Sequence, residues 1–265
     1  MAKKALVTGG AGFIGSHTVD ALAERDFSVR VLDSMVEQVH GTNVRPAYLP
    51  YGVEFVRGDV RDKETVRRAL ADVDVVFHLV AEVGVGQSMY EIVRYCDVNV
   101  VGTANLLEIL ANEKHHVEKL IVASSMSIYG EGRYLCPHCG PVYPNLRTEQ
   151  QLVAHQWELT CPHCSAIVTP RPTNEAKPLQ PTSVYAVTKR DQEELCLAVG
   201  RAYDIPAVAL RFFNAYGTRQ ALSNPYTGVA AIFAARLLNQ HRPIIFEDGL
   251  QSRDFVHVSD IVQAL

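Results

Sequence analysis

The stretch Thr8-Gly9-Gly10-Ala11-Gly12-Phe13-Ile14-Gly15 decides the fold of this 265-residue chain. It follows a short apolar run, Lys4–Thr8, that predicts a strand, and it opens a helical pattern over Phe13–Arg25. Glycine permits a tight turn and lets backbone N–H groups and the positive helix N-terminus approach a pyrophosphate. A turn with this glycine spacing can also merely connect a strand to a helix, so the surrounding residues determine whether it binds a cofactor. The glycines in question are Gly9, Gly12 and Gly15.

Short β-branched runs alternate with helical stretches along most of the chain. Further strands are predicted at Ser28–Asp33, Val53–Val56, Val73–Leu79, Lys119–Ser124 and Pro206–Leu210, and helices at about Asp62–Leu70, Ser88–Asn112 and Ser183–Tyr203. Strands that are apolar on both faces and separated by helices imply a parallel sheet covered on both sides. The prediction is a doubly wound α/β fold of the Rossmann type.

Two carboxylates lie at the ends of predicted strands. Asp33 ends the second strand, where it can accept hydrogen bonds from adenosine ribose hydroxyls and would repel a 2′-phosphate, so NAD is favoured over NADP. Asp59 follows the third strand, and it can either bind the adenine amino group or cap the next helix.

The segment 131–172 breaks the alternation, since it carries four of the six cysteines, six prolines and the only tryptophan. We therefore predict an NAD-binding domain made of residues 1–130 and 173–215, with 131–172 as an insertion. Residues 216–265 are expected to form a partial, smaller substrate-binding lobe.

Within that lobe, Ile244–Phe246 and Asp254–Val258 are predicted to be short strands. The final residues begin a helix with Ser259 as its N-cap and stop within two turns, so we expect the chain to be truncated at its C-terminus.

Composition narrows the classes of function. The chain has 25 Lys and Arg against 29 Asp and Glu, which gives no basic surface for nucleic acid and favours a small-molecule partner. The N-terminus enters a strand at once and lacks the apolar core of a signal peptide. No apolar run approaches the roughly 20 residues that cross a bilayer. We expect a cytoplasmic protein that binds neither membrane nor nucleic acid.

Tyr185 and Lys189 lie four residues apart in a helical run, so both side chains project from one face of the helix. A tyrosine with its ordinary pKa of about 10 is a poor base, but a nearby ammonium and a bound nicotinamide cation can stabilise its phenolate. Alternatively, the pair is an ordinary one on a helix surface.

Serines 124, 125 and 127 follow the fifth strand, at the edge of the sheet where ligands bind. A serine there can hydrogen-bond a substrate oxygen and the tyrosine hydroxyl. Capping of the strand end by hydroxyls is the alternative.

An ordered series of motifs resembles the extended short-chain dehydrogenase/reductases, and specifically the NAD-dependent nucleotide-sugar epimerase/dehydratase family. The resemblance covers nearly everything outside 131–172. The motifs are the glycine turn, Asp59, His78-Leu79-Val80-Ala81, Asn99, Ser-Ser-x-x-Ile-Tyr-Gly at 124–130, Tyr185-x-x-x-Lys189, Arg211-Phe212-Phe213-Asn214 and Arg253-Asp254-Phe255-Val256-His257-Val258.

The resemblance implies roles for individual residues. Ser125, Tyr185 and Lys189 would be catalytic. The substrate contacts would be Ser125, Asn214, Arg219 and Arg253, with guanidinium suited to phosphate. The NAD contacts would be Gly9, Gly12, Phe13, Ile14, Gly15, Asp33, Asp59, Val60, Leu79, Ala81, Asn99, Tyr185, Lys189 and Phe213.

The same resemblance separates reaction types. The family's 4,6-dehydratases place an Asp-Glu pair directly after the catalytic hydroxyl residue, because eliminating water needs an additional acid and base. Here those positions are Met126 and Ser127. We therefore expect 4-epimerisation of a nucleotide-diphospho-sugar. Tyr185 would take the C4 hydroxyl proton and NAD the C4 hydride, and the hydride would return to the other face of a 4-keto intermediate.

Other functions stay open at this point. The run Asn224–Val229 and the cysteine-bearing insertion are similar to epimerases that act on dTDP-6-deoxyhexoses such as dTDP-L-rhamnose, while UDP-glucose/UDP-galactose is the other choice. A 4,6-dehydratase or 4-ketoreductase is the second enzyme hypothesis, and a noncatalytic NAD-binding scaffold with a zinc ribbon is the third. Helix pairing is common in the family, so we expect a homodimer.

Two Cys-Pro-His-Cys sequences predict a structural zinc site with the ligands Cys136, Cys139, Cys161 and Cys164. A single Cys-x-x-Cys pair would instead fit redox chemistry. Four thiolates leave no open coordination position, and metal ligation could supply the folding energy of a segment with few apolar residues. The insertion lies between Ser125 and Tyr185 in sequence, so it could shape the sugar pocket, cover it or contact a second subunit.

Overall fold

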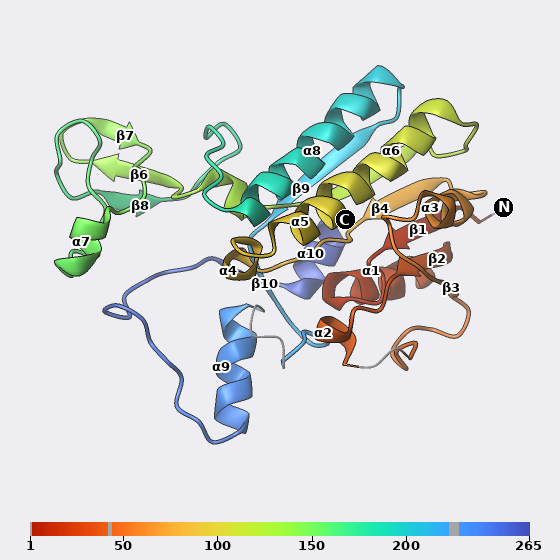
Figure 1. The fold of residues 1–265 in the computed structure, drawn as a ribbon, viewed down its shortest axis with the longest axis horizontal. Helices are drawn as coiled ribbons and strands as arrows, with labels where there is room; N and C mark the ends of the chain where they lie inside the picture. The colour runs from red at the N-terminus through yellow and green to blue at the C-terminus, as the bar shows by residue number, and fades with distance from the viewer. Residues whose placement is uncertain (1, 42–43, 223–227) are drawn as a thin grey trace.

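The computed structural model describes residues 2–41, 44–222 and 228–265 (Figure 1). Its centre is a six-stranded parallel sheet with the order β3-β2-β1-β4-β5-β9. This arrangement confirms the predicted doubly wound fold. The strands are β1 (Lys4–Thr8), β2 (Ser28–Asp33), β3 (Glu54–Arg57), β4 (Val75–His78), β5 (Lys119–Ser125) and β9 (Ala207–Phe212).

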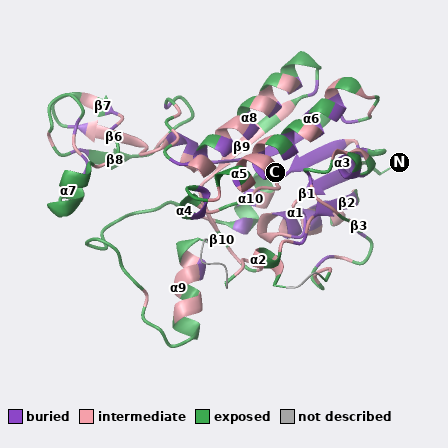
Figure 2. Ribbon diagram, viewed as in Figure 1, coloured by how far each residue is buried: buried purple, intermediate pink, exposed green. Residues whose placement is uncertain are grey.

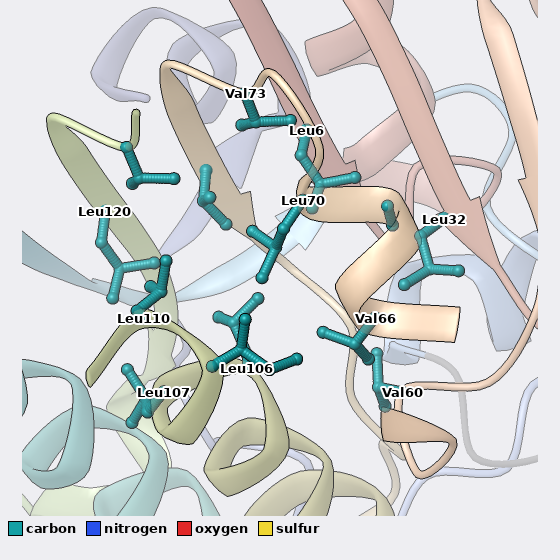
Figure 3. Close-up of a cluster of buried hydrophobic side chains, with 14 of the residues drawn as sticks. Leu6, Leu32, Val60, Val66, Leu70, Val73, Leu106, Leu107, Leu110 and Leu120 are labelled. Atoms are coloured by element: carbon teal, nitrogen blue, oxygen red, sulfur yellow. The ribbon is translucent and has the colours of Figure 1, made fainter. Parts of the chain in front are cut away.

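The two faces of the sheet bury separate apolar cores, because side chains alternate along each strand. On β1, Leu6 contributes to one core, and its neighbours Ala5 and Val7 contribute to the other. The first core packs the sheet against α3 (Lys63–Leu70), α6 (Gly102–Asn112) and α8 (Val184–Ala202) (Figure 3). The second packs it against α1 (Phe13–Ala23). The central strands are accordingly largely buried (Figure 2).

The helix predicted over Ser88–Asn112 is broken into shorter pieces. These are α4 (Val85–Ser88), α5 (Ile92–Tyr95), a π-helical stretch η1 (Cys96–Val101) and α6. Apolar periodicity ran through the whole segment, but it does not distinguish an α-helical turn from the wider π-helical turn. Such turns are rare and are often found at functional sites.

The insertion 131–172 forms a small body of its own, to one side of the central sheet (Figure 1). Three antiparallel strands have the order β7-β6-β8, and a short helix that comes between β7 and β8 in the chain lies below them in Figure 1. These elements are β6 (Arg133–Cys136), β7 (Gly140–Val142), β8 (Thr169–Arg171) and α7 (Glu149–Val153). Their buried apolar cluster is small: Cys136, Val142, Leu159, Cys161 and Val168.

The residues after β9 depart from the predicted elements. Ile244–Phe246 is not a strand, because this connection is exposed and finds no partner strand among the described residues. The strand predicted at Asp254–Val258 is present as β11 (Phe255–His257), which pairs with β10 (Asn214–Tyr216).

Three further elements complete the fold. α2 (Glu37–His40) and α9 (Val229–Leu238) were not predicted. α10 (Val258–Ala264) is capped by His257 rather than by Ser259, because the imidazole accepts the Ser259 N–H. The run 224–229 lies outside the described residues up to residue 227. Within the described ranges, no helix combines the length and apolar character needed to cross a bilayer.

Candidate functional site

A cleft of about 480 Å³ runs along the carboxyl edge of the central sheet. The glycine turn after β1 and the ends of β2, β4 and β5 line one side of it, together with Tyr185 from α8. The segment Phe212–Ala215 and Phe255 line it near the end of β9. Ligands of open α/β sheets bind at this edge.

The glycine turn is packed so closely that side chains are excluded. Gly9 has a φ of +69°, and a Cβ on it would lie 2.9 Å from the Cα of Val80. A Cβ on Gly15 would lie 2.1 Å from the carbonyl oxygen of Gly9. No side chain caps the N-terminus of α1 at Gly12, and the first residues of this helix, Phe13, Ile14 and Gly15, line the cleft. The turn therefore suits an anionic group held by the backbone.

Asp33 lies at the cleft end of β2 and is 7% exposed. Its carboxylate accepts hydrogen bonds from the N–H groups of Ala11 at 3.0 Å and Met35 at 2.9 Å, and His40 Nε2 lies 3.5 Å from it. These contacts orient the carboxylate against the glycine turn, where an adenosine ribose is predicted to bind.

Asp59 also lines the cleft, but it does not cap a helix. It accepts hydrogen bonds from the backbone and guanidinium of Arg61, and Asp62 is the N-cap of α3, accepting the Glu64 N–H at 3.1 Å. The capping alternative for Asp59 is therefore wrong. The predicted contact with adenine stays a prediction.

Ser125 and Tyr185 come together across the cleft from β5 and α8. Burial raises the pKa of Tyr185, and the nearby Ser125 hydroxyl acts in the opposite direction. Ser125 Oγ also accepts hydrogen bonds from the N–H of Ser127 at 3.2 Å and its Oγ at 2.9 Å. Ser124 Oγ is buried without a partner among the described residues, so Ser125 is the serine that meets the tyrosine.

Lys189 lies about one helical turn after Tyr185 in α8 and begins a buried polar network. Its Nζ donates to Gln192 Oε1 at 2.5 Å, and Gln192 Nε2 donates to Thr103 Oγ1 at 2.9 Å. His78 continues the network, with Nε2 2.9 Å from Thr103 Oγ1 and Nδ1 3.0 Å from Thr8 Oγ1. Burial lowers the pKa of Lys189 to about 8 and that of His78 to about 3, so this histidine is neutral at physiological pH.

Sequence reasoning did not single out Gln192 or Thr103. Each of them is a polar residue at a helix position that faces the sheet, and this is the signal by which the sequence could have indicated them. Because buried polar groups require partners, such positions indicate a network. This network joins Lys189 to the strand ends that carry the glycine turn.

Asn99 departs from its predicted place. It is fully buried in η1 and is not among the described residues that line the cleft. Its side-chain amide bonds both backbone groups of Glu82, at 2.7 and 3.1 Å, and Thr188 Oγ1 at 3.0 Å. Asn99 therefore holds the loop after β4, which does line the cleft, from behind.

The remaining predicted cofactor contacts line the cleft, with the exception of the buried Lys189. They are Gly9, Gly12, Phe13, Ile14, Gly15, Asp33, Asp59, Val60, Leu79, Ala81, Tyr185 and Phe213.

The four predicted substrate contacts are not gathered at one place. Ser125 and Asn214 line the same cleft, and Asn214 Nδ2 lies 3.6 Å from the sulfur of Met126. Arg219 lines it too, but its guanidinium pairs with Asp20 of α1 at 2.7 Å, on the side of the glycine turn. Arg253 is not among the described lining residues. The two arginines thus do not form the shared phosphate site that the resemblance implies.

The four cysteines of the insertion cluster as predicted. Their sulfur atoms all lie within 4.8 Å of one another, and the N–H groups of His138 and His163 point at Cys136 Sγ and Cys161 Sγ, each at 3.4 Å. Four sulfurs at this spacing, with backbone donors to thiolate, fit a tetrahedral Zn²⁺ ion. No residue of the insertion is among the described residues that line the cleft.

A family model described as "NAD dependent epimerase/dehydratase family" matches residues 5–146 and 162–265. The chain belongs to this family. The internal residues that the match leaves out, 147–161, fall inside the insertion.

Individual relatives agree with the family assignment. A dTDP-L-rhamnose 4-epimerase from Burkholderia thailandensis is 39% identical over 99% of this chain and 72% of the relative. A putative UDP-glucose 4-epimerase from Methanocaldococcus jannaschii is 36% identical over 98% of this chain and 71% of the relative.

Solved structures give the same picture. UDP-glucose 4-epimerase from Thermotoga maritima with UDP-glucose superposes with a TM-score of 0.76 at 31% identity, covering 98% of this chain and 71% of the other. The Thermus thermophilus UDP-glucose 4-epimerase complex with NAD superposes with a TM-score of 0.72 at 32% identity, covering 98% and 72%.

Proposed function

We propose that this protein is an NAD-dependent 4-epimerase of a nucleotide-diphospho-sugar. The observation that carries the proposal is the meeting of Ser125 and Tyr185 in the cleft that begins at the glycine turn. Met126 and Ser127 line the cleft beside them and offer neither of the carboxylates that an added elimination of water would use. The two relatives described above are both named as 4-epimerases.

The residues of the cleft fit NAD. The glycine turn leaves backbone N–H groups for a pyrophosphate, and Asp33 would accept the hydroxyls of the adenosine ribose. Bound NAD would supply a hydride acceptor and donor at C4 of the sugar.

The chain's own residues would handle the proton. Tyr185 would remove the proton of the C4 hydroxyl and later return it, while Ser125 would hydrogen-bond the same oxygen. The ammonium of Lys189 would lower the free energy of the Tyr185 phenolate, and Gln192 would hold that ammonium by accepting its hydrogen bond.

For the sugar, we favour a dTDP-6-deoxyhexose such as dTDP-L-rhamnose over UDP-glucose/UDP-galactose. The support is the higher identity to the relative named dTDP-L-rhamnose 4-epimerase, 39% against 36% for the relative named as a UDP-glucose enzyme.

Cys136, Cys139, Cys161 and Cys164 would hold a structural zinc ion. The support is the cluster of sulfurs within 4.8 Å, together with an apolar cluster too small to fold the insertion by burial alone. Its four thiolates would leave no position for substrate, so the metal would have no part in the reaction.

A homodimer formed through α4, α5 and α8 accounts for a run of exposed apolar side chains. Val85, Met89, Ile92 and Val93 are 50 to 73% exposed, and Val187 of the neighbouring α8 is 37% exposed. A patch of this kind on one face suits a self-complementary two-fold contact. Val93→Asp should give a monomer in sedimentation analysis, and an unchanged mass would contradict the dimer proposal.

The direct test is incubation of the protein with a panel of dTDP-, UDP- and GDP-sugars, with C4 inversion read by NMR. Inversion of one sugar without net consumption of NAD is the expected result. A released 4-keto product, or stoichiometric oxidation of NADH, would favour the dehydratase or ketoreductase alternative. NAD binding without conversion of any sugar would favour the scaffold.

A further inference from the structure

An ion pair joins the insertion to the connection between α9 and β11. The Arg147 guanidinium binds the Glu247 carboxylate with two contacts of 2.8 Å, Nη1 to Oε2 and Nη2 to Oε1, although the residues are 100 positions apart. Arg147 Nη1 also donates to the Trp157 carbonyl at 3.3 Å. The two charged side chains are 24% and 20% exposed, so they are partly withdrawn from solvent. Two-point pairing of this kind fixes orientation as well as distance.

Glu247 lies in the connection between α9 and β11, which is largely exposed and has no regular secondary structure. In Figure 1 this connection passes beneath the insertion on its way to β11. Gln251 Nε2 donates to Glu247 Oε2 at 2.7 Å, which extends the contact along the connection. The ion pair therefore fixes a segment that has few other restraints.

The other end of the same segment is fixed at the cleft. Asp254 offers its carbonyl oxygen to the Asn214 N–H at 3.2 Å and to Asn214 Nδ2 at 3.1 Å. Phe255 follows and pairs with Asn214 in the register of β10 and β11, and both residues line the cleft. Residues 247–254 are thus held at the insertion by one end and at the cleft by the other.

Arg253 lies in this doubly held segment, next to its cleft end. Arg147 lowers the pKa of Glu247, and Arg253 adds to the effect. Arg253 is exposed, and within the described chain it forms no ion pair that would occupy its guanidinium. Its Nη1 donates to the Ser252 carbonyl at 2.7 Å, which leaves the other guanidinium N–H groups free to bind an anion. Arg253 does not itself line the cleft, but it lies two residues before Phe255, which does.

We propose that Arg147 and Glu247 are positioning residues through which the insertion holds residues 247–254, and with them Arg253 and Phe255, for the nucleoside diphosphate of the substrate. This inference rests on the proposed function. The insertion would contribute to affinity without lining the cleft, because a segment already held at both ends loses less conformational entropy when substrate binds. NAD binds near the glycine turn and should not depend on this contact.

The test measures binding of dTDP and UDP by calorimetry in Arg147→Ala and Glu247→Ala, together with KM and kcat for the sugar that the wild type inverts. We expect the Kd and the KM to rise about three- to fivefold, as for loss of a partly exposed ion pair, with kcat and the Kd for NAD unchanged. The double variant Arg147→Glu/Glu247→Arg should bring the Kd back toward the wild-type value.

Arg67→Ala is the matched control, because Arg67 of α3 pairs at 2.8 Å with Glu113 at the end of α6 and neither residue is among the described lining of the cleft. This variant should leave every one of these constants unchanged. Bound zinc and the circular dichroism spectrum should match the wild type in all variants. Unchanged Kd and KM values in both single variants would overturn the inference, as would losses of zinc or NAD binding that accompany the weaker nucleotide binding.

The inference and the proposed function can fail separately. If the wild type inverts no sugar but its nucleotide affinity depends on Arg147 and Glu247, the epimerase proposal fails and the positioning role stands. If the wild type inverts a sugar with a KM that neither variant changes, the positioning role fails alone. A wild type that binds neither nucleotide would overturn both.

Discussion

The central sheet and the insertion 131–172 are stabilised in different ways. The sheet buries two extensive apolar clusters, one on each face, and its polar interior groups bond one another. The insertion buries an apolar cluster of only five residues, two of them cysteines of the proposed metal site. Burial scales with the size of a body, so a small body needs cross-links or a metal where a large one does not.

The residues proposed to carry out the reaction therefore lie in a different part of the molecule from the insertion, which is proposed to support substrate binding. Ser125 of β5, Tyr185 of α8 and the cleft between them lie at the edge of the sheet, and the insertion contacts the chain after β9 through Arg147 with Glu247. Damage to the insertion should therefore change its own folding and substrate affinity, whereas damage at the sheet edge should change the reaction.

Removal of the metal tests the comparison most severely. Cys161→Ser should abolish stoichiometric zinc binding and expose 131–172 to limited proteolysis, because ligation would supply most of the folding free energy of the insertion, on the order of 10 kcal/mol. The Kd for NAD should change less than twofold. Metal analysis, proteolysis and NAD titration provide the measurements.

Cys96→Ser is the control, since Cys96 lies outside the cluster. If NAD binding were lost together with zinc, the two regions would fold as one unit and the comparison would be wrong.

Tyr185→Phe tests where the reaction takes place. It should lower kcat by roughly 10² to 10⁴, as for loss of a general base, with zinc content and thermal unfolding unchanged. Tyr203→Phe, at the end of the same helix, should behave as wild type. Sugar conversion by Tyr185→Phe at the wild-type rate would refute the proposed role.

Apolar truncation compares the two cores directly. Leu106→Ala, at a side chain 1% exposed in the sheet core, should lower the free energy of unfolding by about 3 kcal/mol because it leaves a cavity. Leu159→Ala, 7% exposed in the insertion, should change the main unfolding transition by less than about 1 kcal/mol. Denaturant unfolding followed by circular dichroism measures both. Equal losses would show that the insertion core supports the whole chain.

His78 makes the stability of the sheet depend on pH. Its pKa is about 3 in the folded state against 6.5 as the ordinary value, so between these limits only the unfolded chain takes up the proton. Stability should therefore fall as pH decreases from 6.5, by about 1.4 kcal/mol for each pH unit.

His78→Gln should remove this slope in denaturant unfolding at a series of pH values, while His138→Gln, at an exposed position, should retain it. An unchanged slope in His78→Gln would assign the acid sensitivity to other groups.

Much of the fold followed from local patterns. The strands Lys4–Thr8 and Ser28–Asp33 have the bounds that were predicted, because a strand buried on both faces is largely apolar and polar residues mark its two ends. The segment Ser88–Asn112 was harder, since a π-helical stretch keeps the apolar periodicity of an α-helix. Ile244–Phe246 has the composition of a strand but lacks a neighbouring strand to pair with among the described residues.

The candidate site shows the same division. The sequence by itself determined the glycine turn, Asp33 and the Tyr185–Lys189 pair, because their function depends on spacing within one element or one turn. It also determined the four cysteines, whose spacing within each pair is local.

Only the tertiary structure decided which distant groups meet. It placed Asn99 behind the cleft, joined Lys189 to His78 through Gln192 and Thr103, and paired Arg147 with Glu247. Local sequence carries residue type and periodicity, whereas these contacts depend on how separate elements pack and on where buried polar groups find partners.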